Sequence, residues 1–236
     1  MGFPKPHILV SNTFTTYCNS MLGSRDIRRV IVAYLNERHK SLRRTSTDPT
    51  RIYATEASQC TRLSYYERVD PIISDSAELF QFLLTHGLRS SLENVESEYK
   101  ADSLTLVLEA DIVLNKEFVV KLQTADSLPD SPKPQDLLYL NACLHAFDKH
   151  EGILIYVRGD GKSSEFLVAK SAKMFEELIR RARVLSTLLK EKRVPIVEPS
   201  QSCMTCKYYG RCYTMERKET SFSIEGLFGK SKNEPG

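Results

Sequence analysis

Three of the six cysteines stand close together near the end of the chain. Cys203, Cys206 and Cys212 form the pattern C-x2-C-x5-C, in which short loops allow three thiolates to converge on one metal ion or cluster. The natural fourth ligand is Cys60, which is far away in sequence, in the segment Ser58-Gln59-Cys60-Thr61-Arg62. We therefore predict a four-thiolate centre that ties two distant parts of the chain together, so that loss of a ligand destabilises the fold.

The predicted centre has two candidate occupants. Four thiolates suit a [4Fe-4S] cluster and a tetrahedral zinc ion equally well, and His145 or His150 could replace one thiolate in a zinc site. Spacing alone does not decide between them. The remaining cysteines, Cys18 and Cys143, are expected to be small buried apolar side chains.

A second set of residues stands between the two groups of cysteines and could bind a divalent ion and act on a phosphate. Asp111 lies on a predicted strand and Lys121 on the next one, whereas His86 lies on a predicted helix. Gln135 and Tyr139 lie one turn apart on one face of a later helix. Singly, each has an ordinary structural explanation, such as a core histidine or an aspartate at a strand edge. Hard divalent ions prefer carboxylate oxygens, which makes Asp111 the central candidate ligand.

The order of these residues resembles that of the CRISPR-associated RecB-like exonucleases, the fourth Cas protein family, within the PD-(D/E)xK nuclease superfamily. The similarity spans roughly residues 54 to 213. It implies an α/β fold with a PD-(D/E)xK nuclease core, in which helices flank a mixed central sheet, and it favours a [4Fe-4S] cluster over zinc. The implied activity is metal-dependent exonuclease cleavage of single-stranded or frayed DNA ends in CRISPR spacer acquisition, with the integrase complex as a partner.

The resemblance also implies roles for single residues. Asp111 would bind Mn²⁺ or Mg²⁺, and His86 would supply a nitrogen ligand that favours manganese. Lys121 would orient the attacking water and stabilise negative charge on the phosphorane. Gln135 and Tyr139 correspond to a pair that contacts DNA and supports the site. Further DNA contacts are expected from arginines and tyrosines, with core packing as the alternative for at least one tyrosine: Arg62, Tyr65, Tyr66 and Arg89.

One expected carboxylate is missing from this pattern. The family has Glu-x-Lys, whereas this chain has Val119-Val120-Lys121. Glu109 is the better substitute, because residues i and i+2 of a strand share a face and lie about 7 Å apart, which places it beside Asp111. Glu117 is the other candidate. Without a substitute, the chain would be an iron–sulfur DNA-binding or adaptor subunit with weak or no cleavage. A zinc-stabilised nucleic-acid-binding protein is the third alternative.

Composition indicates an ordinary globular protein. The chain has 236 residues, of which 41% are hydrophobic and 27% charged, and a net charge of +3 that is too small to indicate nucleic-acid binding. Without a signal sequence or an apolar membrane span, we expect a cytoplasmic protein whose cysteines are ligands rather than disulfides. The predicted organisation has four parts: an N-terminal helical extension 1–53, a nuclease core 54–200, a cysteine segment 201–215 packing with Cys60, and a flexible tail 216–236.

Hydrophobic periodicity predicts alternating helices and strands. Helices are expected at 24–44, with a basic face, and at 74–99, 135–149 and 173–193. Strands are expected at 104–113 and 118–124, which should form a hairpin, and at 153–157 and 166–169.

Overall fold

The computed structural model describes residues 33–39, 46–72, 76–92, 94–114 and 117–213. Of the helix predicted over 24–44, residues 33–39 are helical, and the rest lies outside the described residues. Cys18 and the tail predicted over 216–236 also lie outside them. The N-terminal extension can therefore be compared with its prediction only in part.

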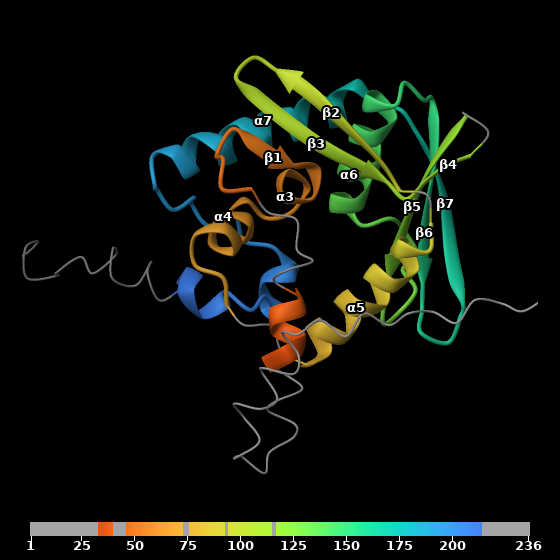
Figure 1. Cartoon of the computed structure of the whole chain (residues 1–236), viewed down its shortest axis with the longest axis horizontal. Coiled ribbons are helices and arrows are strands. Elements are labelled where there is room, and N and C mark those ends of the chain that lie inside the picture. Colours follow the sequence, from red (N-terminus) through yellow and green to blue (C-terminus); the bar gives the residue numbers. More distant parts are fainter. Residues whose placement is uncertain (1–32, 40–45, 73–75, 93, 115–116, 214–236) are drawn as a thin grey trace, which may run out of the picture.

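The described strands form two mixed sheets (Figure 1). The first has the order β1-β3-β2, and in it β1 (Arg51–Tyr53) runs parallel to β3 (Leu104–Ala110) while β2 (Val95–Ala101) is antiparallel. The second has the order β4-β5-β6-β7, in which only β5 and β6 are parallel. The fold is thus mixed α/β, as predicted, although the sheet is divided in two. The strands of the second sheet are β4 (Ile112–Leu114), β5 (Phe118–Thr124), β6 (Glu151–Val157) and β7 (Ser163–Ala169).

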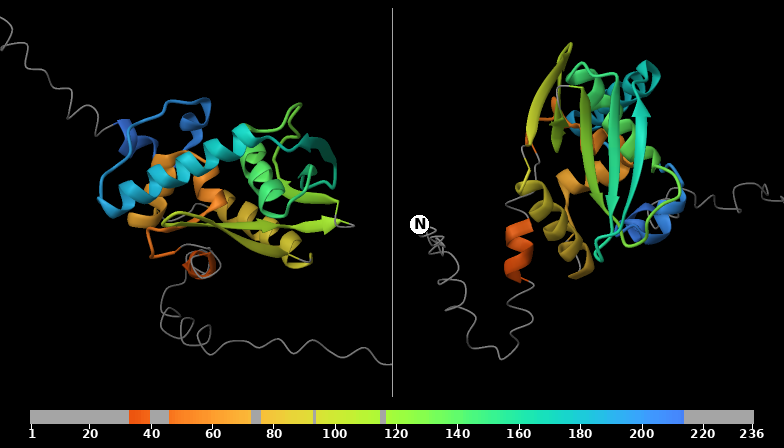
Figure 2. Two further views of the ribbon diagram at one scale, coloured as in Figure 1. Left: turned by 90° about the horizontal axis from the view of Figure 1, so that it is seen from above. Right: turned by 90° about the vertical axis from the view of Figure 1, so that its right-hand side faces the viewer.

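The chain crosses from one sheet to the other at Asp111. The single strand predicted over 104–113 is two strands, because β3 ends at Ala110 and β4 begins at Ile112. The hairpin prediction therefore holds for β4 and β5 alone, whereas β3 pairs with β1 and β2. The Asp111 N–H donates to the carbonyl of Val120 at 3.2 Å, which fixes the corner against β5. Figure 2 shows the two sheets from two further directions.

The helix predicted over 74–99 is too long. Helix α5 spans Ser76–Ser90, and the chain continues as edge strand β2. The helix ends here because the Asn94 side chain donates to the carbonyl of Arg89 at 2.8 Å and satisfies a group that the next turn would have used. Strand β2 was not predicted because its side chains are mostly polar and exposed, so that it lacks apolar alternation.

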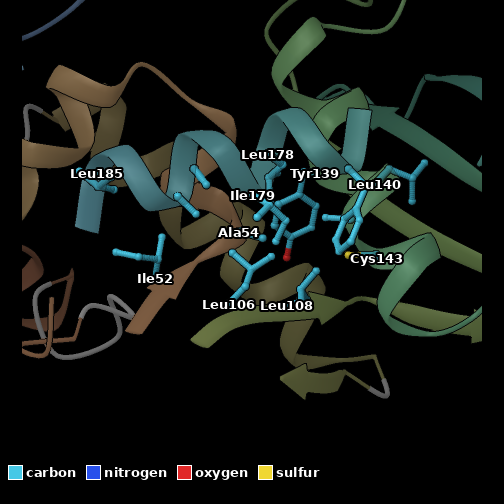
Figure 3. Close-up of a cluster of buried hydrophobic side chains, with 14 of the residues drawn as sticks. Ile52, Ala54, Leu106, Leu108, Tyr139, Leu140, Cys143, Leu178, Ile179 and Leu185 are labelled. Carbon is cyan, nitrogen blue, oxygen red and sulfur yellow. The ribbon is translucent and has the colours of Figure 1, made fainter. Parts of the chain in front are cut away.

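Two helices cover β3 and enclose the main core (Figure 3). Helix α6 (Pro134–Ala146) begins with proline at its first turn, and Ser171 caps α7 (Ala172–Lys190) by accepting from the Met174 N–H at 3.5 Å. Both agree with the helices predicted over 135–149 and 173–193. Two shorter helices, α3 (Ala54–Ser58) and α4 (Thr61–Val69), pack against α7, and the 3₁₀ helix η1 (Gln201–Thr205) follows it. Among the described residues, no helix is long and apolar enough to cross a membrane.

The contact between β6 and α6 depends on a missing side chain. A Cβ atom at Gly152 would lie 2.9 Å from the Val119 carbonyl oxygen and 3.0 Å from Leu140 Cδ1. We expect Gly152→Ala to lower the free energy of unfolding by roughly 1–3 kcal/mol, the usual cost of overpacking a core. Gly159→Ala is the matched control, because a Cβ there meets nothing within 4 Å. Urea unfolding of both variants checks this, and equal losses would contradict it.

Candidate functional site

Asp111 lies at the centre of the predicted site and is fully buried. Its Oδ2 accepts a hydrogen bond from the Leu122 N–H at 2.7 Å. Its Oδ1 lies 3.2 Å from Lys121 Nζ and also 3.2 Å from Arg89 Nε. Both oxygens of the carboxylate are therefore engaged by the protein itself, and two cations neutralise the single negative charge.

Lys121 shares this buried setting. Its Nζ lies 4.5 Å from the centre of the Tyr139 ring, and the Tyr139 hydroxyl donates to the backbone carbonyl of Glu109 at 2.7 Å. Burial lowers the pKa of Lys121, and the nearby Arg89 lowers it further, while Asp111 opposes both effects. Burial also raises the pKa of Tyr139 well above its ordinary value, so its hydroxyl remains a donor.

A cavity of about 500 Å³ adjoins this charged group. Four of the residues that line it are His86, Arg89, Glu109 and Tyr139. Glu109, the predicted substitute carboxylate, thus lines a cavity that Asp111 does not line, whereas Glu117 is exposed. Val119, at the position of the missing glutamate, is wholly buried in the apolar core.

The predicted metal ligands do not form a metal site in this arrangement. Asp111 is not among the residues lining the cavity, and its oxygens are taken by Arg89, Lys121 and a backbone N–H. Within the described ranges, no three His, Cys, Asp or Glu side chains lie close enough together to hold a metal ion. His86, Glu109 and Asp111 therefore do not fit a manganese or magnesium ion as they stand.

The four cysteines predicted as ligands line a second cavity, of about 970 Å³. Cys60 is exposed, and the other three, Cys203, Cys206 and Cys212, are half-buried. The structure thus places Cys60 beside the terminal trio, although 143 positions separate Cys60 from Cys203 (203 minus 60). Neither His145 nor His150 is among the lining residues.

Side-chain contacts hold the cysteine segment against α4. Lys207 Nζ lies 2.7 Å from Glu67 Oε1, and Arg211 Nη1 lies 2.9 Å from Asp70 Oδ2. The fully buried Tyr208 stacks on Tyr66 with ring centres 5.3 Å apart, and its hydroxyl accepts from the Ile72 N–H at 3.0 Å. These contacts fix the segment that carries the three terminal cysteines.

The charges around the cysteine cavity favour an anionic occupant. Arg62, Arg181 and Lys207 line it, against two acids, Asp126 and Glu198. Arg62 is 6% exposed, and its Nε has no hydrogen-bond partner among the described residues. Burial and the three other thiols raise the pKa of Cys212, while Arg62 lowers it. The four thiols line one net positive cavity, but no three of them lie close enough together among the described residues to form a metal group as they stand.

Several predicted DNA contacts lie elsewhere than expected. Tyr65 and Tyr66 are 3% and 6% exposed and pack in the core, so core packing, the alternative left open, applies to both and neither ring faces solvent for stacking on bases. Arg62 lines the cysteine cavity, and Arg89 binds Asp111. Gln135 also lines the cysteine cavity, although Tyr139, one turn further along α6, lines the other one.

Two residues near the site were missed by sequence reasoning. Gln59 lines both cavities, and its position beside Cys60 was the only available signal. Asp136, in the first turn of α6, is buried and accepts a hydrogen bond from the Tyr156 hydroxyl at 2.6 Å. Burial raises the pKa of Asp136. An acid two residues after Pro134 looked like an ordinary first-turn residue, so nothing in the sequence marked it.

The fold defined here is shared with a solved structure. The crystal structure of SSO0001 superposes with a TM-score of 0.56 and 19% sequence identity, and the alignment covers 79% of this chain and 96% of that one. At this identity the likeness establishes a shared fold and carries no information on activity.

Two structures of the alkaline exonuclease LHK-Exo from Laribacter hongkongensis are more distant. The enzyme itself superposes with a TM-score of 0.41 at 8% identity, covering 61% of this chain and 90% of that chain. Its complex with dAMP superposes with a TM-score of 0.41 at 9% identity, covering 60% and 88%. No protein-family model matches the sequence, and no curated protein matches it significantly.

The lowered pKa of Lys121 makes stability depend on pH. Between this pKa and the unfolded value near 10.5, the unfolded chain keeps a proton that the folded chain releases, so stability rises with pH. Groups that do not contact Lys121 contribute equally in the wild type and in Lys121→Met, so their effects cancel. We expect the difference in unfolding free energy to move in favour of the wild type as the pH rises toward the unfolded value near 10.5. Urea titrations measure it, and parallel curves would contradict the assignment.

Proposed function

We propose that this chain is a DNA-binding subunit with a RecB-like nuclease fold, a [4Fe-4S] cluster on four cysteines and a nuclease centre that does not cleave. The supporting observation is the state of Asp111, whose oxygens are bound by Arg89, Lys121 and the Leu122 N–H. A metal-dependent nuclease needs carboxylate oxygens free to hold an ion that activates water. The four cluster ligands would be Cys60, Cys203, Cys206 and Cys212.

The position of Val119 supports the absence of cleavage. This side chain lies on the same face of β5 as Lys121, where a second carboxylate is expected from the sequence resemblance, and it is buried in the core. An apolar residue contributes no ligand, so any ion would have to be held by fewer protein oxygens.

The lining of the cysteine cavity supports the cluster. A cluster with four thiolates is anionic, and Arg62, Arg181 and Lys207 supply positive charge around it. When bound, the cluster would supply either a covalent staple or an electron-transfer centre.

The DNA substrate class follows from the sequence resemblance. Single-stranded or frayed ends would lie along the two cavities, which share Gln59 in their walls. By the same resemblance, the protein partner would be the CRISPR integrase complex, with new spacer ends as the DNA.

Metal analysis tests the cluster. Protein purified without oxygen should be brown and contain about four iron and four sulfide per chain, and Cys60→Ser should lose most of both. Cys143→Ser is the matched control, because Cys143 is buried elsewhere and its thiol donates to the Glu109 carbonyl at 3.6 Å. Stoichiometric zinc in a colourless preparation would instead favour the zinc-stabilised alternative.

A nuclease assay tests the absence of cleavage. End-labelled single-stranded DNA should be retained by the wild type equally well in EDTA and in Mn²⁺, and it should not be shortened. The second candidate is the metal-dependent exonuclease, favoured by Glu109 and His86 lining one cavity close to Asp111. If the exonuclease candidate is correct, Mn²⁺ will cause the labelled DNA to be shortened, and the Asp111→Ala variant will not shorten it. That result would contradict our proposal and favour the exonuclease.

A further inference from the structure

We infer that Arg89 is a built-in replacement for a divalent ion at Asp111, and that it keeps this site free of metal. The inference rests on the proposed function for its biological meaning and deepens it, because it names the group that closes the site. It follows from the disagreement described above between the predicted ligands and their observed partners.

The guanidinium of Arg89 contacts both the carboxylate and the neighbouring strand. Its Nε forms an ion pair with Asp111 Oδ1 at 3.2 Å without hydrogen-bond geometry, and its Nη2 donates to the carbonyl of Leu122 at 3.3 Å. The N–H of Leu122 in turn donates to Asp111 Oδ2 at 2.7 Å. Arginine, carboxylate and one strand residue thus form a closed set of contacts, and the arginine side chain is only 22% exposed.

The backbone of Arg89 is also fixed. The residue lies in the last turn of α5, and its carbonyl accepts the Asn94 side chain at 2.8 Å. His86 lies one turn earlier on the same helix and lines the same cavity. The end of α5 therefore places the cation of Arg89 against Asp111. His86, a potential nitrogen ligand, lies one turn away on the same helix.

Charge explains why this arrangement excludes a metal ion. Lys121 and Arg89 together bring two positive charges to one buried carboxylate. An incoming divalent ion would meet two like charges at short range in a poorly solvated site, where Coulomb repulsion is strong. Arginine stays protonated at every accessible pH, so this block is permanent, unlike one made by lysine alone.

Removal of the guanidinium should open the site. Without it, Asp111 Oδ1 keeps only Lys121 as a partner, next to a cavity that already carries Glu109 and His86. A carboxylate pair with one imidazole is a ligand set that binds Mn²⁺. These three side chains do not form a metal group as they stand, so the substitution would create a site by letting them turn toward one ion in the space that the guanidinium leaves.

Manganese titration without DNA, followed by the EPR signal of free Mn²⁺ and by calorimetry, tests this inference. The wild type should have no saturable site that depends on Asp111. Arg89→Met should bind one Mn²⁺ at least about tenfold more tightly than the wild type, a difference of about 1.4 kcal/mol. The double variant Arg89→Met with Asp111→Asn should lose that site.

Two further variants control for charge and for folding. Arg183→Met removes an equal charge from an exposed pair with Asp102 and should leave Mn²⁺ binding unchanged. Arg89→Gln is the substitute variant if Arg89→Met does not melt cooperatively and is therefore not folded. It retains a donor for the Leu122 carbonyl, and it should also gain the Mn²⁺ site.

The outcomes separate the inference from the proposed function. The inference is overturned if the wild type binds Mn²⁺ at a site that Asp111→Asn abolishes. It is also overturned if an Arg89 variant folds but binds Mn²⁺ no more tightly than the wild type. Shortening of DNA by the wild type overturns the proposed function instead. Metal binding is measured without DNA, so neither result depends on the other.

Discussion

The buried carboxylate of Asp111 is the constraint on which the arrangement of this molecule depends. It sits where the chain leaves one sheet and enters the other, and it contacts β5 through the Leu122 N–H and α5 through Arg89. An isolated carboxylate at such a position would be prohibitively costly to desolvate, and the cations of Arg89 and Lys121 offset that cost. Sheet junction, helix end and strand are therefore joined by one charged group.

The same contacts bear on whether Asp111 can hold a metal ion. A nuclease centre must leave its carboxylate oxygens accessible, and that requirement opposes the stability of a buried ion pair. Here Val119 adds apolar packing and Arg89 adds a fixed counter-charge, so both positions favour stability over metal binding. The fold shared with SSO0001 does not decide this question, because a fold does not determine a site.

Sequence reasoning predicted the elements that carry strong periodicity or clear caps, such as α6, α7 and β5. It missed edge strand β2, since an exposed strand needs no apolar alternation, and it joined β3 to β4, since a corner at a buried aspartate leaves no turn signature. Of the candidate site, the meeting of Cys60 with the terminal cysteines and the contact of Lys121 with Asp111 were anticipated. The contact of Arg89 with Asp111 was not anticipated, because only the three-dimensional arrangement determines which charged side chains meet.

The contacts that dock the cysteine segment have a consequence for the life of the protein. Tyr208, Lys207 and Arg211 anchor this segment on α4 by stacking and ion pairing. Side-chain contacts with α4 therefore position the terminal cysteines at the cavity that Cys60 also lines. Under our proposal of a cluster, the docked segment would present its thiols to incoming iron and sulfide, and Cys60 would be the most exposed of the four ligands.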